Sequence, residues 1–376
     1  MNNALDLAAP PVRQLAPYIP GKPLSELERE YGISNSIKLA SNENPLGPGS
    51  KARAAIVQAV QSLGLYPDGN GFELKQALAK HHGCTLDRIT LGNGSNDLLV
   101  LLAEAFLSPD VEAVYSQYCF AIYPLAVQAT GATARVAPAY PESHAMALGH
   151  DLNSMYEQVN SRTRLVFVAN PNNPTGTWVN ADSLQQFIAA LPATTLVVVD
   201  EAYIEYAPDN FADASHWIDE FPNLVVTRTF SKAYGLAGLR AGYALSSAEV
   251  ASVLNRVRQP FNMNSLALAA ATAALDDHEH LQHTVELNSK GMQQVVAGLE
   301  NLDVRAYPSA GNFVLIDCQR SSAAMNEALL RQGVIVRPVG AYALPTHLRI
   351  TIGTEQQNAR MLLAMQHALQ QVIPSF

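Results

Sequence analysis

The sequence predicts an α/β fold, with a mostly parallel central sheet in a large domain and a smaller α+β domain. Between about residues 86 and 245, short apolar runs alternate with longer segments of helical periodicity, which is typical of a parallel sheet covered by helices. After about residue 248 the chain becomes a long helical stretch rich in Ala, Leu and Gln, followed by shorter mixed elements. We expect residues 46–250 to form the large domain, and residues 1–45 with 251–376 to form the small one.

Individual elements follow from the same patterns. The strands expected in the large sheet are residues 88–91, 113–115, 165–169, 196–199, 224–228 and 241–245. Most are near-continuous Val, Leu and Phe, as in strands buried on both faces. Residues 97–106 and 182–191 carry apolar residues at helical spacing and acidic residues in the first turn, which predicts helices. In the small domain we expect strands at 313–317, 334–337 and 348–352, and a closing helix at 358–372.

Composition excludes several classes of protein. A chain of 376 residues with 48% hydrophobic and 15% charged content can bury a large core, so we expect a folded protein rather than a disordered one. The net charge of -9 argues against a protein that binds nucleic acid through a basic face. The three cysteines, Cys84, Cys119 and Cys318, are scattered, and we expect buried small side chains rather than a disulfide framework or a metal site.

The sequence also predicts where in the cell the protein is located. The first ten residues lack the basic start and apolar segment of a secretion signal, and no apolar run approaches the ~18 residues that span a bilayer. We therefore expect a cytoplasmic protein.

Lys232 is the strongest candidate for chemistry, in a glycine-containing turn that follows the expected strand 224–228. A desolvated lysine amine has a lowered pKa and can form an imine with an aldehyde cofactor. Hydroxyls at Thr229 and Ser231, with Arg240 eight residues past the lysine, can hold a phosphate through charge-assisted hydrogen bonds. A lysine taken alone is more often a solvated surface residue, so the hypothesis depends on the surrounding pattern.

Asp200 and Tyr203 follow the expected strand 196–199. A carboxylate at the C-terminal end of a strand can pair with a protonated pyridine nitrogen and keep that ring an electron sink. Tyr203 can then donate to the phenolic oxygen of the same cofactor. The alternative is that Asp200 only caps the N-terminus of a helix.

Two loops carry further candidates. Asn170 follows the expected strand 165–169 and begins a turn with two prolines and a glycine; its amide can reach the same phenolic oxygen, or the segment is only a turn. Gly94, Ser95 and Asn96 form a small-residue loop that opens a helix. The free N–H groups of such a loop suit a phosphate, and the alternative is a helix cap.

Together the four motifs are more specific than any one of them. Their order is Gly94-Ser95-Asn96, then Asn-Pro-Asn-Asn-Pro-Thr-Gly at 170–176, then Asp200-Glu201-Ala202-Tyr203, then Ser231-Lys232-x-x-Gly-x-x-Gly-x-Arg240. This order resembles the fold-type I aminotransferases, which use pyridoxal 5′-phosphate. The resemblance implies that Lys232 holds the cofactor and moves the proton between the substrate's α-carbon and the cofactor.

Two further contacts to the cofactor are implied by the resemblance. The family stacks an aromatic ring on the cofactor, and Phe120 matches that position; the usual proline is missing from Tyr118-Cys119-Phe120, so Tyr118 stays an alternative. Tyr66 resembles a tyrosine that reaches the phosphate across a dimer interface, which implies a homodimer with shared active sites. The alternative for Tyr66 is a simple aromatic residue in a turn.

Within this fold the chain resembles the histidinol-phosphate aminotransferases over almost its whole length. The segments that carry the resemblance are residues 18–23, 39–48, 66–69, 336–338 and 348–354. Such enzymes convert L-histidinol phosphate and 2-oxoglutarate to 3-(imidazol-4-yl)-2-oxopropyl phosphate and L-glutamate, in histidine biosynthesis. The implied substrate site has Arg349 as the clamp for the anionic group, Arg337 and Tyr18 at the phosphate, and Asn44 nearby.

Three other functions share parts of the pattern. The same subfamily contains aromatic amino acid aminotransferases acting on phenylalanine or tyrosine, and a hydrophobic pocket separates ring types by only ~1–3 kcal/mol per group. A decarboxylase of a phosphorylated amino acid uses a very similar scaffold. A ligand-sensing regulator on this fold needs an attached DNA-binding domain, which neither residues 1–45 nor the acidic charge provides.

Overall fold

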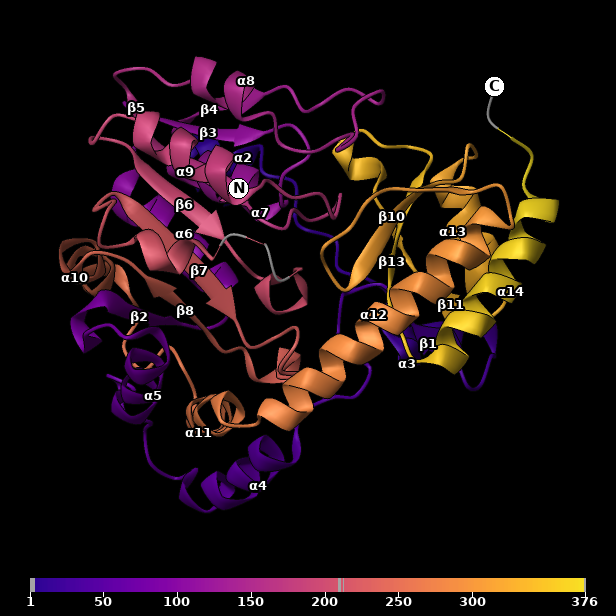
Figure 1. Cartoon of the computed structure of the whole chain (residues 1–376), viewed down its shortest axis with the longest axis horizontal. Helices are drawn as coiled ribbons and strands as arrows, with labels where there is room; N and C mark the ends of the chain where they lie inside the picture. The colour runs from indigo at the N-terminus through magenta and orange to yellow at the C-terminus, as the bar shows by residue number, and fades with distance from the viewer. Residues whose placement is uncertain (1–3, 209–210, 212, 375–376) are drawn as a thin grey trace.

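Two bodies of unequal size make up the molecule. The computed structural model describes residues 4–208, 211 and 213–374. The larger body is built around a seven-stranded sheet and the smaller around a four-stranded sheet. The long helix α12 (His278–Glu300) runs from one body to the other (Figure 1).

The large sheet is mostly parallel, as predicted. Its strands lie in the order β2 (Ile89–Gly92), β8 (Gly242–Leu245), β7 (Leu224–Thr229), β6 (Leu196–Asp200), β5 (Thr163–Ala169), β3 (Glu112–Ser116) and β4 (Thr133–Ala137). Only β8 runs antiparallel to its neighbours in this sheet. The edge strand β4 was not predicted, because its residues are largely exposed and form no continuous apolar run. The six strands that were predicted are confirmed to within a residue or two.

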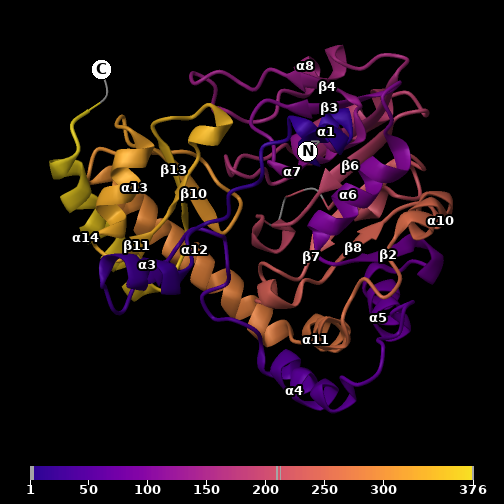
Figure 2. The same ribbon diagram turned by 180° about the vertical axis from the view of Figure 1, so that it is seen from behind.

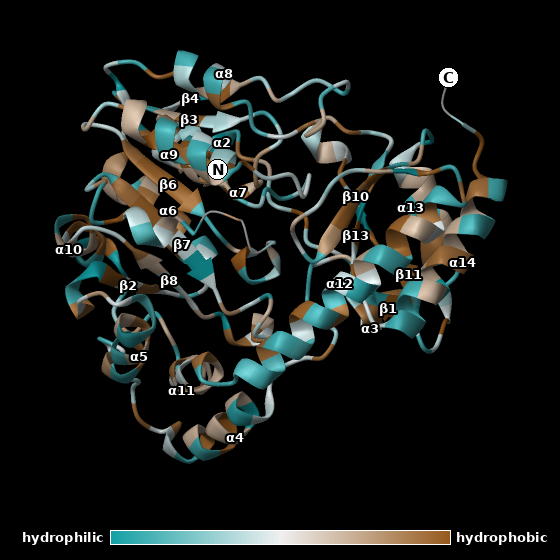
Figure 3. Ribbon diagram, viewed as in Figure 1, coloured by the Kyte–Doolittle hydropathy of each residue, from teal (hydrophilic) through white to brown (hydrophobic). Residues whose placement is uncertain are grey.

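Helices cover both faces of this sheet. One face packs against α6 (Ser95–Phe106), α7 (Ile122–Thr130) and α10 (Ala248–Val257). The other packs against α4 (Ser50–Ala59), α5 (Phe72–His82), α8 (Leu152–Glu157), α9 (Ala181–Ala190) and α11 (Ser265–Leu275). The two helices predicted at 97–106 and 182–191 are therefore confirmed as α6 and α9. In Figure 3, strands β5 and β6 in the middle of the sheet are largely hydrophobic, whereas helices α9 and α10 also carry hydrophilic residues.

The small body contains an antiparallel sheet with helices packed on it. Its strands are β12 (Arg337–Pro338), β13 (His347–Thr351), β10 (Phe313–Asp317) and β9 (Arg305–Ala306), in that order. The helices are α13 (Ser322–Leu330), α14 (Glu355–Gln371) and the second half of α12. A separate parallel pair joins β1 (Ile37–Lys38) to β11 (Val334–Ile335), beside α3 (Leu24–Tyr31). The predicted strand 334–337 is therefore wrong as one strand, because the chain changes from one sheet to the other at Val336.

The packing also bears on the expected domain boundaries. Helix α11 packs against α4 and α5, and Leu254 of α10 lies in the core beside α6. Residues 251–275 thus share the core of the large body, although we expected them in the small domain. We propose that the boundary after the large domain lies within α12 rather than at residue 250.

The remaining short elements complete the chain. The N-terminal helices α1 (Ala4–Leu7) and α2 (Pro10–Arg13) lie over the large body, and α2 contacts α7 (Figure 2). Short 3-10 helices occur at Val60–Ser62, Leu86–Arg88, Ile204–Tyr206, Ala214–Trp217, Ala237–Leu239 and Gly340–Tyr342. Across the described ranges, none of the helices combines the length and the apolar character that crossing a bilayer requires.

Candidate active site

A cavity lies between the two bodies, at the carboxyl ends of β5, β6 and β7. Open α/β sheets bind ligands at this edge because the loops after neighbouring parallel strands converge there. The large body contributes Ser95, Asn96, Phe120, Asn173, Asp200, Tyr203, Thr229, Ser231, Lys232 and Arg240. The small body and the N-terminal segment contribute Tyr18, Ser41, Asn42, Arg337 and Arg349. Most of the residues proposed from the sequence therefore meet in one place.

Lys232 points into this cavity from the turn after β7. Its Nζ donates a hydrogen bond to the carbonyl oxygen of Ser41 at 3.0 Å. Desolvation lowers the pKa of Lys232 to about 7, and the positive charge of Arg349 acts in the same direction. A large share of the amine is therefore unprotonated near neutral pH, which a nucleophilic lysine requires.

Asp200 ends β6 with its carboxylate enclosed. The Tyr123 hydroxyl donates to Oδ2 at 2.9 Å and the Thr227 hydroxyl donates to Oδ1 at 3.1 Å. Burial raises the pKa of Asp200 to about 6, although the hydrogen bond from Tyr123 opposes the shift. A cationic partner such as a protonated pyridine nitrogen would favour the ionised carboxylate.

A phosphate-sized corner lies where the N-terminus of α6 meets the turn after β7. Arg240 donates from Nη1 to the Ser231 hydroxyl at 3.2 Å. Gly94 has a φ of +84°, and a Cβ there would lie 2.6 Å from the Arg240 guanidinium, so a side chain would displace that arginine. The corner combines a guanidinium, hydroxyls and the free backbone N–H groups of a helix start, which suits a phosphate ester.

Asn170 does not line the cavity, contrary to our expectation. Its side chain accepts a hydrogen bond from the Val179 N–H at 2.9 Å and donates to the Val179 carbonyl at 3.2 Å, which closes the loop after β5. Asn173 lines the cavity instead, where its Oδ1 accepts from Arg349. Within the described part of the chain, its Nδ2 has no hydrogen-bond partner. The sequence signal for Asn173 was present in the same motif, directly before Pro174.

Phe120 and Tyr118, the two candidates for the ring that stacks on the cofactor, lie in different places. Phe120 lines the cavity and meets Tyr123 edge-on, with ring centroids 5.9 Å apart. Tyr118 packs instead against the cluster that contains Tyr307 and Leu315. Phe120, rather than Tyr118, therefore faces the cavity.

The two arginines of the small body are neighbours in its sheet. Arg337 of β12 pairs in register with Arg349 of β13. Arg349 donates from Nη2 to the Ala40 carbonyl at 2.7 Å, while its Nε is buried with no hydrogen-bond partner among the described residues. Because a buried charged donor without a partner is costly, Arg349 is suited to binding an anion in the cavity.

Arg337 and Tyr18 close the outer end of the cavity. The Arg337 guanidinium lies 5.3 Å from the centre of the Tyr18 ring and donates to the Ile19 carbonyl at 2.7 Å. The N-terminal segment is thereby held against the small-body sheet. This arrangement puts Tyr18 beside Arg337, in the lining of the cavity to which Arg349 also belongs.

Two expected site residues lie outside the cavity of the single chain. Asn44 donates to the Ala233 carbonyl at 2.8 Å and to the Thr284 hydroxyl at 3.0 Å, so it supports the turn that carries Lys232. Tyr66 is 84% exposed and stacks on Phe261. Asn44 is displaced from the expected place because its side chain faces partners within this chain, whereas the role expected of Tyr66 involves the site of a second chain and stays a prediction.

Asn42 is a cavity residue that the sequence did not single out. It lies two positions before Asn44 in the segment Ser-Asn-Glu-Asn-Pro, and it lines the cavity. Its Nδ2 donates to the Tyr203 hydroxyl at 2.9 Å. Both asparagines belong to the motif that carried the resemblance, and the sequence alone does not show which side chain faces inward.

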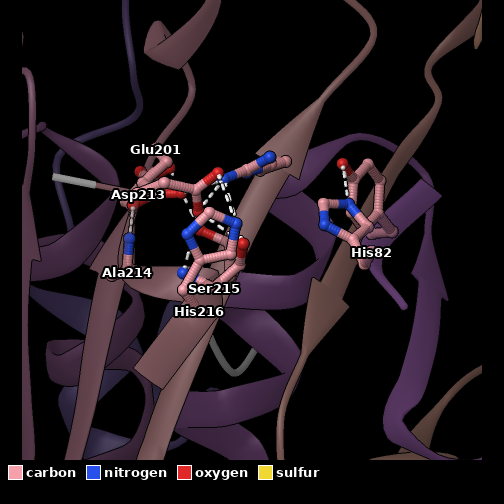
Figure 4. A network of polar contacts seen from close by, with 10 residues as sticks. His82, Glu201, Asp213, Ala214, Ser215 and His216 are labelled. Atoms are coloured by element: carbon pink, nitrogen blue, oxygen red, sulfur yellow. Dashed lines mark hydrogen bonds and ion pairs between the residues drawn. The ribbon is translucent and has the colours of Figure 1, made fainter. Parts of the chain in front are cut away.

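A buried ionic network supports the end of β6 next to Asp200 (Figure 4). Arg228 of β7 donates to Glu201 from Nε at 3.0 Å and from Nη2 at 2.8 Å, and it also pairs with Asp213. The other oxygen of Glu201 accepts from the Ala214 N–H at 2.8 Å. These hydrogen bonds connect the end of β6 to β7 on the face of the sheet opposite to the Asp200 carboxylate.

Comparison with known proteins gives consistent matches. The model of the family "Aminotransferase class I and II" matches residues 34–365. Histidinol-phosphate aminotransferase 2 of Pseudomonas fluorescens is 55% identical over 368 residues, covering 97% of this chain and 98% of that protein. Histidinol-phosphate aminotransferase 1 of Nitrosococcus oceani is 52% identical over 366 residues, covering 97% of each.

Solved structures match as well. The crystal structure of histidinol-phosphate aminotransferase from Sinorhizobium meliloti, in complex with pyridoxal 5′-phosphate, superposes with a TM-score of 0.88 at 31% identity, over 97% of this chain and 98% of that one. Aspartate aminotransferase from Thermus thermophilus, with maleate, superposes with a TM-score of 0.81 at 21% identity, over 96% and 99%. The second match supports the fold alone.

The two asparagines of the turn give a test of the site. We predict that Asn173→Ala weakens the binding of pyridoxal 5′-phosphate about tenfold or more. The variant removes the amide that can donate a hydrogen bond to the phenolic oxygen of the cofactor. Asn170→Ala should instead lower the free energy of unfolding by about 1–3 kcal/mol, because the Val179 N–H and carbonyl lose their partners, with little change in cofactor binding. Absorbance titration and urea denaturation measure the two effects. An equal loss of cofactor affinity in both variants would contradict this assignment.

Proposed function

The chain belongs to the class I and II aminotransferases, and from this premise we propose that it transfers the amino group of L-histidinol phosphate to 2-oxoglutarate, a reaction of histidine biosynthesis. The observation that carries the proposal is the meeting, in one cavity, of Lys232 with the adjacent arginines Arg337 and Arg349. A transaminase of this kind needs a reactive lysine for the cofactor and a cationic site for an anionic substrate. The relatives that match almost end to end carry this activity in their names.

Pyridoxal 5′-phosphate fits the residues that line the large-body side of the cavity. We propose that the corner formed by Gly94, Ser95, Asn96, Thr229, Ser231 and Arg240 holds its phosphate. Asp200 would pair with the ring nitrogen, and Phe120 would lie against the ring face. Tyr203, together with Asn173 in place of Asn170, would donate to the phenolic oxygen. The Nδ2 of Asn173, which no group among the described residues engages, supports this last assignment.

Lys232 would have two tasks in the reaction. When bound, the cofactor supplies an electron sink for the electrons released at the substrate's α-carbon. Lys232 would hold the cofactor through Nζ and would move the proton at the substrate's α-carbon. The Ser41 carbonyl, 3.0 Å from Nζ, keeps the free amine at the cavity rather than in solvent.

The arginines would have to accept two different anions in turn. A guanidinium fork binds a carboxylate or a phosphate with paired hydrogen bonds. Arg349 presents a buried Nε without a partner among the described residues, and Arg337 extends the same positive face toward Tyr18. The site can therefore take the phosphate of one substrate and a carboxylate of the other.

We also propose a homodimer located in the cytoplasm. Tyr66 belongs to a stretch of the sequence in which Leu63, Leu65 and Phe72 are exposed as well, and a surface that exposes apolar side chains in this way favours contact with another chain. A second copy that covered this surface would bring Tyr66 to the partner's phosphate corner. The cysteines are all free, which fits a reducing compartment.

The pH dependence of cofactor attachment tests Lys232. Only the unprotonated amine attacks the aldehyde, and the pKa of Lys232 is lowered to about 7. We predict that the rate of attachment rises with pH up to about 7 and levels off above it, measured by absorbance after mixing apoprotein with pyridoxal 5′-phosphate. Lys232→Ala should give no product that borohydride can trap. A rate that keeps rising toward pH 10, as for an ordinary lysine with a pKa of about 10.4, would contradict the prediction.

The substrate assignment is tested at Arg337. We predict that Arg337→Ala lowers kcat/KM for histidinol phosphate about 10- to 100-fold, because a charge-assisted hydrogen bond to the phosphate is lost, and lowers it much less for phenylalanine. Arg331→Ala, at an exposed arginine of the small body that pairs with Glu327, serves as the matched control. Equal losses on both substrates would remove Arg337 from phosphate recognition. A wild-type preference for phenylalanine or tyrosine would instead favour an aromatic amino acid aminotransferase.

The dimer is tested through its mass and through Tyr66. We predict a mass of twice 40.5 kDa by light scattering, and faster loss of cofactor from Tyr66→Phe, because the phosphate would lose one hydrogen bond. Tyr156→Phe changes a half-exposed tyrosine of the large body that does not line the cavity, and it should leave cofactor retention unchanged. A fully active monomer would contradict the shared site.

A further inference from the structure

Asn42 lies where the cofactor side and the substrate side of the cavity meet. It is only 1% exposed, and its φ of +57° is a left-handed conformation that asparagine adopts more readily than most residues. The segment 40–42 makes three successive contacts to functional side chains, namely Arg349, Lys232 and Tyr203 in that order. The first two involve backbone carbonyls, so only the contact of Asn42 depends on the identity of the side chain.

Both ends of the Asn42 amide are used. Its Nδ2 donates to the Tyr203 hydroxyl at 2.9 Å, and its Oδ1 accepts from the Thr351 hydroxyl at 3.1 Å. The Thr351 oxygen in turn accepts from the Asn42 backbone N–H at 2.9 Å. Because that oxygen already accepts from the backbone, its own O–H is free to donate to Oδ1, which turns the amide NH₂ toward Tyr203.

This arrangement determines what the Tyr203 hydroxyl can do. A tyrosine hydroxyl has one O–H to donate and accepts through its oxygen. Since its oxygen accepts from Asn42, its single O–H is left for another acceptor at the cavity that Tyr203 lines. Hydrogen bonds in such a chain polarise one another, so the bond from Asn42 makes Tyr203 a stronger donor.

We propose that Asn42 is a positioning residue for Tyr203: it directs the tyrosine O–H to the phenolic oxygen of the cofactor and, through Thr351, connects that contact to the strand that carries Arg349. The proposal rests on the proposed function, because it assumes pyridoxal 5′-phosphate in the cavity. Thr351 and Arg349 lie two residues apart on β13, so their side chains share one face of the sheet. An anion bound at Arg349 would thereby be connected to the cofactor oxygen through strand β13 and the three side chains of Thr351, Asn42 and Tyr203.

The test is a pH titration of the visible absorbance band of the cofactor-loaded protein. The proton between Lys232 Nζ and the phenolic oxygen is held more tightly when that oxygen loses a donor, so Tyr203→Phe should raise the apparent pKa of the band. We expect Asn42→Ala to raise it by about half a unit, the value of part of one hydrogen bond. In a protein that already carries Tyr203→Phe, Asn42→Ala should add no further shift.

Thr351 provides a second, independent pair of variants. Thr351→Val removes the hydroxyl at nearly constant volume and should shift the pKa of the band in the same direction as Asn42→Ala, whereas Thr351→Ser should keep the wild-type value. Asn288→Ala is the matched control, because it removes a buried asparagine of α12 whose Nδ2 donates to the Gly311 carbonyl at 3.3 Å and that bonds neither Tyr203 nor β13, and it should leave the pKa of the band unchanged. Circular dichroism establishes that each variant is folded before titration.

The outcomes separate the two proposals. A wild-type protein that forms no visible band with pyridoxal 5′-phosphate would overturn the proposed function. A normal band whose pKa does not move in Asn42→Ala, or moves equally with and without Tyr203→Phe, would overturn the positioning role alone. If Asn42→Ala does not fold, the Thr351→Val and Thr351→Ser pair decides the question: an unchanged pKa in Thr351→Val overturns the connection to β13 and the proposal with it.

Discussion

The parallel register of β5, β6 and β7 is the constraint on which the rest of the site depends. Ala169 of β5 pairs with Asp200 of β6, and Asp200 pairs with Thr227 of β7. The three strands therefore end at one level, and the turns that follow them meet at one edge of the sheet. Asn173 and Lys232 reach the same cavity as Asp200 for this reason, although they are distant in the sequence. A shift of one residue in either pairing would turn the side chains to the opposite faces.

Charges near this edge are placed so that most of them are paired. Glu201 and Arg228 lie on the side of the sheet facing away from Asp200, where two hydrogen bonds join them. Breaking such a pair leaves a buried charge without a partner, which is strongly destabilising. Lys232 and Arg349 are different, because each keeps capacity for a ligand: the lysine through its lowered pKa, and the arginine through an Nε without a partner among the described residues. The cations left available are those that the proposed reaction uses.

The small body completes the cavity through short segments rather than through a large surface. Strands β12 and β13 supply the two arginines in register, and the segment 40–42 passes between the bodies and contacts three functional side chains. The backbone carbonyls of Ala40 and Ser41 accept hydrogen bonds from Arg349 and Lys232. These two contacts depend on the position of the segment and not on the identity of its side chains. Asn42 is the exception, because its amide connects the tyrosine of one body with the strand of the other.

The sequence by itself determined the fold class, most strands, and the candidates Lys232, Asp200 and Arg349 that the structure brings to one cavity, because regular strands leave only a few directions for the residues that follow them. It did not determine which asparagine of a loop faces the cavity. Asn170 turns to Val179 and Asn44 to Ala233, while Asn173 and Asn42 turn inward. In irregular loops the direction of a side chain depends on partners brought close by folding, and those partners lie up to hundreds of residues away, so only the tertiary structure decided it.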